Sequence, residues 1–420
     1  MVFIIAPNPP ARGAAAAPPM PTKPGDPMFA VLTRARKPIA RLVTLLAAAW
    51  LAACQPVGPG LGTGPSIDTS TPVQVALLVP SGSGNSGDAV LAQSLENAAR
   101  MAIDDLRGVT VDLRVYDTAA NPQQARAAAS RAVDEGARVI LGPVYAEAAN
   151  AAAVAVAPRG VNVLSFSNNT TVAGGNLFVL GQTFQNTANR LVGFAAAQGR
   201  RNMLVVHSDD APGRLGRQAI SDAAARAGLT LAGAVSYPLS QDGVIDAVPR
   251  IVERTKEAGA DTLFLTANTA GALPMLTQML PEAGLEPGPD LQFAGLTRWD
   301  IPAQTLELPG VQGGWFALPD PQLTDRYRAR YRETYSGDPH PISGLAYDGV
   351  AAIGALVEAG RRDALTTGAL TQQAGFQGVN GIFRLRPDGT NERGLAVARI
   401  TDGEVEVIAP APRPFGRAGL

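Results

Sequence analysis

The chain has 420 residues, of which 46% are hydrophobic and 17% charged; this composition is globular, and the length suffices for two domains. The formal net charge is −1, and it becomes about −6 when the basic segment before Cys54 is set aside. Nucleic-acid binding requires clustered Lys and Arg, so an acidic chain argues against it. With one cysteine, Cys54, and two distant histidines, the sequence allows no intramolecular disulfide and predicts neither a metal site nor a cofactor.

Residues 1–53 contain the features of an export signal. Basic residues between Arg34 and Arg41 precede an apolar run, Leu42–Ala53, which is shorter than the roughly 20 residues of a membrane-spanning helix. A basic stretch, an apolar run of this length and small residues before a cleavage point define a signal peptide. We expect translation to start at Met28, because the residues before it are rich in Pro and Ala and weakly charged.

The apolar run ends in Leu51-Ala-Ala-Cys54, which resembles the lipobox of bacterial lipoproteins. The resemblance implies cleavage before Cys54, acylation of its thiol and stable anchoring by several acyl chains. Because residue 55 is Gln rather than Asp, the resemblance also implies transfer to the outer membrane. The alternative is an apolar stretch that ends in cysteine by chance. Residues 54–71, rich in Gly, Pro, Ser and Thr, are predicted to form a flexible tether behind the lipidated cysteine.

Alternating strand and helix patterns begin at residue 72. The apolar run Val73–Val79 predicts a buried strand, and an apolar residue every three or four positions from Leu91 to Leu106 predicts a helix. A second strand is predicted at Val109–Val115, a helix at Pro122–Glu135 and a third strand at Arg138–Leu141. This order predicts a parallel sheet covered by helices. We assign residues 72–181 to lobe 1.

The same order restarts further along the chain, and we assign residues 182–310 to lobe 2. Residues 311–407 are predicted to return and complete both lobes, and residues 408–420 to form a C-terminal tail. The fold class predicted is α/β, with two similar Rossmann-like lobes that have parallel sheets and a multi-strand hinge. The strands and helices expected in these segments are Met203–His207, Arg214–Ala227, Leu229–Tyr237, Val244–Glu257, Asp261–Thr266, Val311–Leu318, Gln322–Tyr335 and Ser343–Gly360.

Several short motifs in this order resemble the type I periplasmic binding proteins, in the leucine-binding-like branch. They are Val75–Gly82, Val139–Pro143, Val163–Thr170, His207–Gly213 and Gly344–Gly349. The lipobox, the Gly/Pro tether and the opening Leu77-Leu-Val-Pro-Ser-Gly82 resemble most the penicillin-binding protein activator lipoproteins. That resemblance implies a non-enzymatic protein that stimulates a peptidoglycan synthase by contact. Those activators also carry a helical N-terminal domain, for which the stretch after Cys54 has no room.

Candidate ligand-binding residues follow the predicted strands, because ligands of open α/β sheets bind beyond the carboxyl ends of the strands. The Gly/Ser loop after the first strand could hold an anion with its backbone N–H groups. The other loops offer hydroxyl, amide and carboxylate groups. The candidates are Ser81, Gly82, Ser83, Gly142, Ser165, Ser167, Asn168, Thr170, Phe178, Asp209 and Asn268. The alternative for Ser165, Ser167 and Thr170 is that they cap turns and helix ends.

In the amino-acid binders of the family that this chain resembles, an acidic residue of lobe 2 pairs with the ammonium group of the ligand. Here Pro212 replaces the Tyr of the family's Asp-x-x-Tyr-Gly motif, and Asn268 is neutral. A desolvated ammonium without a carboxylate is costly, which argues against an amino acid. Gly82–Gly87 also matches the dinucleotide pattern G-x-G-x-x-G, but Asp117 lies later than usual and export argues against a nicotinamide cofactor.

Two hypotheses follow. The first is a periplasmic lipoprotein that binds a penicillin-binding protein and thereby activates peptidoglycan synthesis. The second is a substrate-binding lipoprotein that delivers an amino acid of the leucine or branched-chain type, or a similar small solute, to an ABC permease. Neither requires catalysis. Both place closure of the lobes at crossings near Phe178–Gln182 and Val311–Leu318.

Overall fold

The computed structural model describes residues 64–415. The predicted export signal, Cys54, most of the tether and the last residues of the tail lie outside the described residues. Within the predicted tether, Ile67 is buried in the core of lobe 1, and its N–H donates to Arg362 O at 2.9 Å. The described end of that segment is therefore packed rather than free, because an apolar side chain gains from burial.

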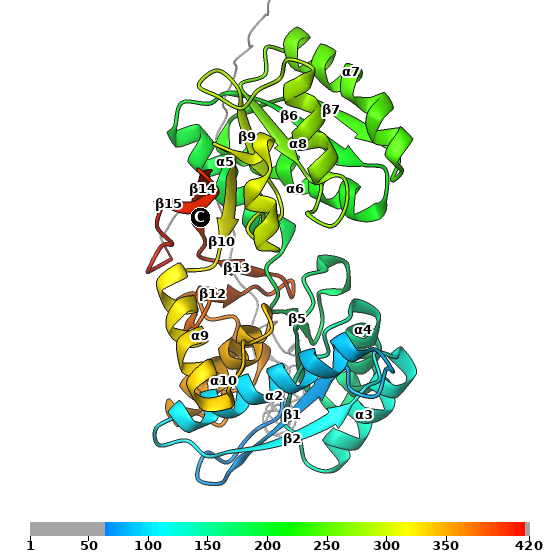
Figure 1. Cartoon of the computed structure of the whole chain (residues 1–420). Coiled ribbons are helices and arrows are strands. Elements are labelled where there is room, and N and C mark those ends of the chain that lie inside the picture. Colours follow the sequence, from blue (N-terminus) through cyan, green and yellow to red (C-terminus); the bar gives the residue numbers. More distant parts are fainter. Residues whose placement is uncertain (1–63, 416–420) are drawn as a thin grey trace, which may run out of the picture. The chain divides into compact units, whose positions relative to one another are not determined.

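Lobe 1 contains a parallel sheet of order β2-β1-β3-β4-β5 (Figure 1). Four of its strands, β1, β3, β4 and β5, are buried because helices cover both faces of the sheet. The edge strand β2 is mostly only partly buried. The strands are β1 (Val73–Val79), β2 (Val111–Asp117), β3 (Val139–Leu141), β4 (Asn162–Ser165) and β5 (Leu177–Val179). β1 has the predicted bounds. The second strand begins later than predicted, because the chain turns at Gly108, where φ is +69°.

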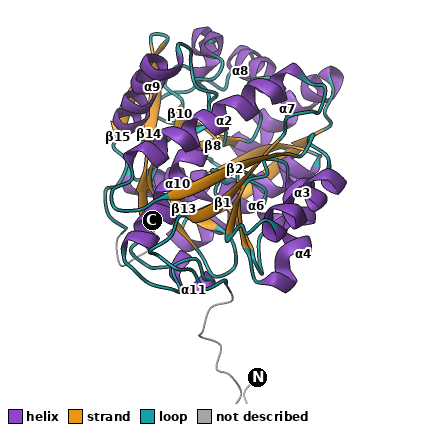
Figure 2. Cartoon of the chain, turned by 90° about the horizontal axis from the view of Figure 1, so that it is seen from below, coloured by secondary structure: helices purple, strands orange, loops and turns teal. Residues whose placement is uncertain are grey.

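Helices from distant parts of the chain cover the sheet of lobe 1. α2 (Ser86–Asp105), α9 (Pro321–Tyr335), α10 (Gly344–Glu358) and α11 (Thr367–Leu370) contribute to the core on one face. α3 (Pro122–Asp134) and α4 (Ala146–Val156) cover the other face (Figure 2). α9 and α10 follow β6 to β10 of lobe 2 in the sequence, so the chain returns to lobe 1 before it adds the last two strands of lobe 2.

Lobe 2 contains a sheet of order β15-β14-β10-β9-β8-β6-β7. Its first five strands along the chain are parallel to each other, but β14 pairs antiparallel with β10 and β15 pairs antiparallel with β14. The prediction of a purely parallel sheet is therefore wrong for lobe 2. A short connection, rather than a crossover helix, joins these last two strands. The strands are β6 (Asn202–Ser208), β7 (Thr230–Tyr237), β8 (Thr262–Leu265), β9 (Gln292–Gly295), β10 (Trp315–Leu318), β14 (Ala396–Thr401) and β15 (Glu404–Ala409).

Two strands of lobe 2 differ from their predictions at one end. β10 begins at Trp315 rather than at Val311, because Pro309–Val311 forms a short 3-10 turn. β15 extends to Ala409 and so into the predicted tail, because Ala409 pairs with Val397. The helices of lobe 2 are α5 (Phe184–Ala197), α6 (Ala211–Ala227), α7 (Gln241–Glu257) and α8 (Leu273–Glu282).

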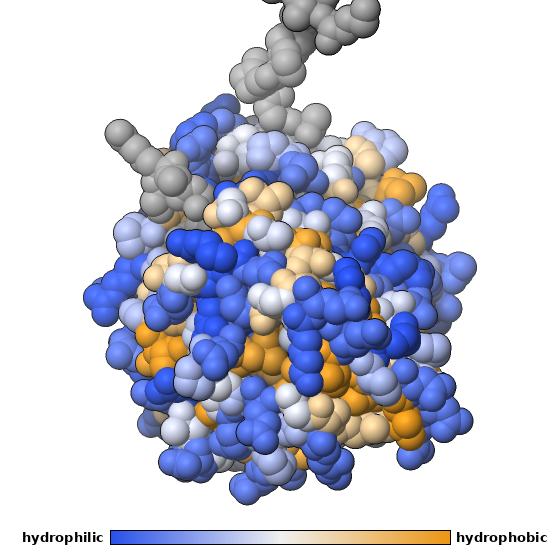
Figure 3. Space-filling model, turned by 90° about the horizontal axis from the view of Figure 1, so that it is seen from above, coloured by the Kyte–Doolittle hydropathy of each residue, from blue (hydrophilic) through white to orange (hydrophobic). Residues whose placement is uncertain are grey.

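A third, antiparallel sheet has the order β11-β12-β13 and packs against α10. Its strands are β11 (Phe376–Gly378), β12 (Gly381–Leu385) and β13 (Asn391–Arg393). The short 3-10 helices outside it are Ala157–Arg159, Thr170–Val172, Ala303–Glu307 and Pro309–Val311. The face seen in Figure 3 is mainly hydrophilic, and hydrophilic residues separate its apolar patches.

Candidate binding site

A cavity of about 680 Å³ is lined by residues of both lobes and of the segments that connect them. Its volume lies in the range of small-molecule sites. Lobe 1 contributes the loops that follow β3 and β4, and lobe 2 contributes the loop that follows β9. The lining residues used below are Tyr145, Phe166, Ser167, Asn168, Thr183, Leu296, Arg298, Ile301, Ile342, Leu345, Asn380, Arg393 and Leu395.

Two of the candidate residues, Ser167 and Asn168, line this cavity. The Ser167 hydroxyl accepts a hydrogen bond from Asn169 N at 3.1 Å. Ser165 is fully buried; its hydroxyl donates to Pro143 O at 2.8 Å and accepts from Ser167 N at 3.1 Å. These bonds are the turn-capping arrangement, and they shape the loop that presents Asn168 to the cavity.

The other candidates of lobe 1 do not line the cavity. In the Gly/Ser loop, the Ser83 hydroxyl accepts from Asn85 N, and the Asn85 side chain caps α2 by accepting from Gly87 N. This loop, with Ser81 and Gly82, is therefore engaged with its own backbone and contributes nothing to the cavity. Gly142 has φ of +84°, and a Cβ there would come within 2.3 Å of Leu78 O, so its role is structural. Phe178 is fully buried in β5, and Thr170 begins a 3-10 helix.

The lobe 2 candidates also lie elsewhere. Asp209 and Asn268 are exposed, and both are outside the cavity lining. Asn268 O accepts from Gly271 N and Leu273 N, which places Asn268 at the turn before α8. His207 near the end of β6 is buried, and its Nδ1 lies 2.8 Å from Ser208 O. Instead of these residues, lobe 2 presents the loop after β9 with Thr297 and Arg298.

The segments that join the lobes are tied together beside the cavity. Asn391 Nδ2 in β13 donates to Val179 O at 2.8 Å and to Gly181 O at 2.9 Å, which lie in the first crossing. Arg393 Nε donates to Leu180 O at 2.8 Å, and Asn186 Nδ2 in α5 donates to Asn391 O at 3.0 Å. The first crossing, β13 and the start of α5 thus form one hydrogen-bonded unit.

Among the described residues that line the cavity, two carry a charged side chain, Arg298 and Arg393, and both are guanidinium groups. Arg298 pairs with Asp300, whose Oδ1 accepts from Nε at 2.5 Å. Arg393 is buried with its side chain only 3% exposed, and its Nη1 donates to the buried Asp348 at 3.0 Å. The Nη2 of Arg393 is buried and has no hydrogen-bond partner among residues 64–415.

A tyrosine at the edge of the cavity covers a buried acid. Tyr145 lines the cavity and is 42% exposed, and its hydroxyl donates to Asp88 at 2.5 Å. This hydrogen bond to Asp88 raises the pKa of Tyr145, so the phenol is neutral at physiological pH. Asp88 itself is 6% exposed and does not line the cavity.

The sequence offered little signal for Arg298, Tyr145 and Arg393. Arg298 follows β9, a strand that no pattern predicted. Asn391–Arg393 is a polar triplet that reads as a surface turn, yet all three residues are buried because they form β13 at the junction of the lobes. A buried position in a polar segment is not visible from hydrophobic periodicity.

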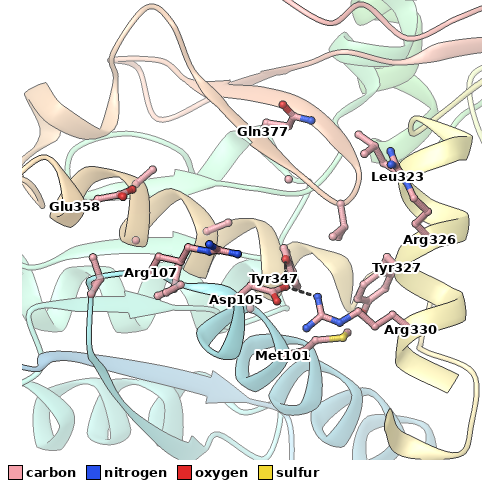
Figure 4. A pocket seen from close by; sticks show the side chains of 18 residues that line it. Met101, Asp105, Arg107, Leu323, Arg326, Tyr327, Arg330, Tyr347, Glu358 and Gln377 are labelled. Atoms are coloured by element: carbon pink, nitrogen blue, oxygen red, sulfur yellow. Dashed lines mark hydrogen bonds and ion pairs between the residues drawn. The ribbon is translucent and has the colours of Figure 1, made fainter. Parts of the chain in front are cut away.

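A separate groove of about 620 Å³ lies on lobe 1, between α2, α9, α10 and the start of the third sheet (Figure 4). In this groove Asp105 pairs with Arg330 and accepts from the Tyr347 hydroxyl at 2.5 Å. Arg326 and Arg330 belong to the arginine-rich helix face of α9, and both are exposed. Because one lobe alone lines this groove, lobe closure would not enclose it.

No set of three or more His, Cys, Asp or Glu side chains is grouped to hold a metal ion between residues 64 and 415. Within the same range, no helix is both long and apolar enough to cross a membrane.

The sequence and the fold were compared with known proteins. The model of the periplasmic binding protein family matches residues 72–404. A branched-chain amino acid ABC transporter periplasmic ligand-binding protein from Burkholderia xenovorans superposes with a TM-score of 0.65 at 18% identity, over 82% of this chain and 96% of that chain. A search among curated proteins finds no match.

Two further solved structures are similar. An ABC transporter substrate-binding protein from Desulfitobacterium hafniense, in complex with Leu, gives a TM-score of 0.61 at 19% identity, over 80% of this chain and all of that chain. A solute-binding protein from Rhodopseudomonas palustris, in complex with 3,4-dihydroxybenzoic acid, gives 0.56 at 19% identity, over 81% and 96%. At these identities the likeness establishes the fold.

This two-lobe fold with its cavity is that of a class of periplasmic proteins that bind solutes and are not catalytic. The chain belongs to the periplasmic binding protein family, because the family match spans most of its length. The predicted α/β fold with two lobes, and the predicted membership of the periplasmic binding protein family, are thereby confirmed. The matches support the second hypothesis, solute binding for an importer, better than the first, activation of a peptidoglycan synthase.

Proposed function

We propose that this protein captures a small, largely apolar solute between its lobes and delivers it to an ABC permease. The observation that carries the proposal is the cavity of about 680 Å³, which residues of both lobes line. A solute held there would contact Asn168 of lobe 1 and Arg298 of lobe 2 at once. Its binding energy would therefore favour the conformation in which the lobes are closed.

The lining favours an apolar solute. Phe166, Leu296, Ile301, Ile342, Leu345 and Leu395 contribute apolar side chains, and amides and hydroxyls come from several segments of both lobes, among them Asn168, Thr297 and Asn380. Small-molecule sites have this composition, in which apolar groups give affinity and a few polar groups fix the orientation. The solved relatives that are described with Leu and with an aromatic acid support a solute of this size.

We also propose that the protein is exported and held by lipid at Cys54, with the outer membrane as its predicted location. The lipobox sequence and the absence of another cysteine support this anchor. Cells grown with radiolabelled palmitate should label the protein, and Cys54→Ser should abolish the label and release the protein from membranes. A labelled Cys54→Ser variant would contradict the anchor.

The activator hypothesis remains a prediction with its own test. The lipobox, the Gly/Pro composition of the tether and the opening Leu77-Leu-Val-Pro-Ser-Gly82 favour it, and it requires a direct complex with a penicillin-binding protein. Pull-down with purified penicillin-binding proteins, with and without a bound solute, distinguishes the two functions. A complex that stimulates glycan polymerisation, together with no bound solute, would favour the activator.

A thermal-shift screen tests solute capture directly. The full protein would be heated with amino acids, aliphatic carboxylates, aromatic carboxylates and neutral amides. A ligand at 100 times its dissociation constant stabilises the folded state by about 2.7 kcal/mol, so a true solute raises the melting temperature by a few degrees. A flat response across every class would contradict the proposed function.

A further inference from the structure

We propose that the solute of the interlobe cavity is an organic carboxylate without an ammonium group, and that Arg298 and Arg393 select it. This inference rests on the proposed function, because it names the class of solute that the same cavity would bind.

The charge of the lining excludes an ammonium group. Arg298 lies beyond β9, and Arg393 lies in β13; the lining contains neither Asp nor Glu among the described residues. An ammonium group transferred from water into this cavity would lose its hydration and find no carboxylate to replace it. An α-amino acid is therefore a poor ligand for this cavity.

Each guanidinium group forms an ion pair with an acid that does not line the cavity. Asp300 accepts from the Nε and Nη2 of Arg298, which leaves Nη1 outside this pair. Asp348 accepts from the Nη1 of Arg393, and Leu180 O accepts from its Nε. An acid in this position fixes the orientation of the guanidinium plane, so that the remaining nitrogen is directed by the protein rather than by solvent.

The Nη2 of Arg393 supplies the second, independent observation. It is a buried donor on a charged group, and no described residue accepts a hydrogen bond from it. Proteins satisfy nearly all such donors, because a buried unpaired donor costs free energy. The guanidinium group also lies over the Phe383 ring, with Cζ 5.0 Å from the ring centroid. A carboxylate oxygen of a bound solute would complete the hydrogen bonds of Nη2 once binding brings this nitrogen to the cavity surface.

The N-termini of two helices also line the cavity. α4 begins at Ala146 and α5 at Phe184, and both residues line the cavity. The N-cap of α4, Tyr145, makes no side-chain capping bond, so the first N–H groups of this helix have no such acceptor. The N-terminus of a helix carries a partial positive charge that favours an anion. Two guanidinium groups and these helix ends therefore act in the same sense.

Matched probes separate the inference from the proposed function. Isothermal titration calorimetry of the full protein would compare a carboxylic acid with its amide, its amine and its α-amino acid on branched aliphatic, linear aliphatic and aromatic skeletons. For at least one skeleton, the acid should bind about tenfold or more tightly than its three partners. An amino acid, amide or amine that binds as tightly as the acid would overturn the inference but leave solute capture intact. No binding by any probe would overturn both.

Substitutions then assign the selectivity to residues. Arg298→Gln should weaken binding of the acid about tenfold or more while affinity for the amide stays within about twofold, and Arg298→Lys should recover part of the loss. Arg326→Gln, which removes the same charge from the exposed face of α9, is the matched control and should bind as the parent does. Unchanged affinity of Arg298→Gln for the acid would overturn the assignment. The affinity of Arg393→Gln for the acid is a second measurement and should also fall; it is interpreted only when the unfolding transition of this variant remains cooperative.

Discussion

Asp348 in α10 is hydrogen-bonded to two other segments at the junction of the lobes, residues 379–380 and β13. It is fully buried in α10, and it accepts hydrogen bonds from Val379 N at 2.8 Å, from Asn380 Nδ2 at 3.1 Å and from Arg393 Nη1 at 3.0 Å. Gly378 lies against it so closely that a Cβ would come within 2.0 Å of Asp348 Oδ1. One carboxylate thus fixes both the start of the third sheet and the orientation of a residue that lines the cavity.

Asp348→Asn should destabilise the fold strongly. The substitution leaves the Arg393 guanidinium buried without its counter-charge, and breaking a buried pair costs about 3–5 kcal/mol. Urea unfolding followed by circular dichroism measures the change. Asp363→Asn is the control, because Asp363 pairs with Arg361 on the surface and should leave the midpoint almost unchanged. Equal midpoints for the two variants would contradict the structural role of Asp348.

Asp105 makes a small contribution to the stability of the fold, and this contribution depends on pH. The hydrogen bond from Arg330 is the main cause that lowers the pKa of Asp105 below its ordinary value of 3.8. A lowered folded-state pKa adds stability above the unfolded pKa, and this stability is lost as the pH falls through the folded-state value. Because the side chain is 34% exposed, the contribution at neutral pH should stay below about 1 kcal/mol.

The free energies of unfolding of the parent and Asp105→Asn, measured between about pH 6 and pH 3, test this sign. The difference should be present at the upper end and should shrink only below about pH 4. A difference that grows as the pH falls would contradict it.

At the scale of elements, α5 connects the first crossing to lobe 2. Thr183 begins the helix with a capping box: its hydroxyl accepts from Asn186 N, and the Asn186 side chain accepts from Thr183 N. Thr183 is 3% exposed and lines the cavity. The cap therefore fixes the direction in which the chain enters lobe 2.

Thr183→Ala should lower stability by about 0.5–2 kcal/mol, the usual cost of losing an N-cap. Thr183→Ser retains the hydroxyl and should lose much less. Chemical denaturation of the three proteins makes the comparison. A serine variant as unstable as the alanine variant would show that the methyl group, rather than the cap, stabilises this position.

Long elements with a continuous apolar pattern could be predicted from the sequence. β1 has its predicted bounds, Val73–Val79, and α10 occupies Gly344–Glu358 within the predicted Ser343–Gly360, because both elements are buried on most sides and their apolar residues recur without interruption. Of the candidate site residues, Ser167 and Asn168 in the loop after β4 line the cavity, and their role in binding stays a prediction.

The remaining site could not be predicted, for a physical reason. The cavity combines loops that lie far apart in the sequence, and its charged residues come from the loop after β9 and from β13. Strand ends indicate an edge of a sheet, but the orientation of the lobes decides which loops of that edge meet. Asp209 and Asn268 lie at the predicted kind of position and still do not line the cavity.

At the scale of the whole molecule, two sheets with helices on both faces are joined by segments that are hydrogen-bonded to each other. Closure of the lobes must preserve the bonds of Asn391 to the first crossing, or exchange them, so motion is confined to a hinge. A solute that contacts both lobes supplies the free energy that shifts this equilibrium.

A crystal structure of the protein with the solute that gives the largest thermal shift tests this account most directly. We predict that the solute lies between the lobes, in contact with Asn168 and with the guanidinium group of Arg298. A solute bound in the groove of lobe 1 between α2, α9 and α10, with the interlobe cavity empty, would contradict it.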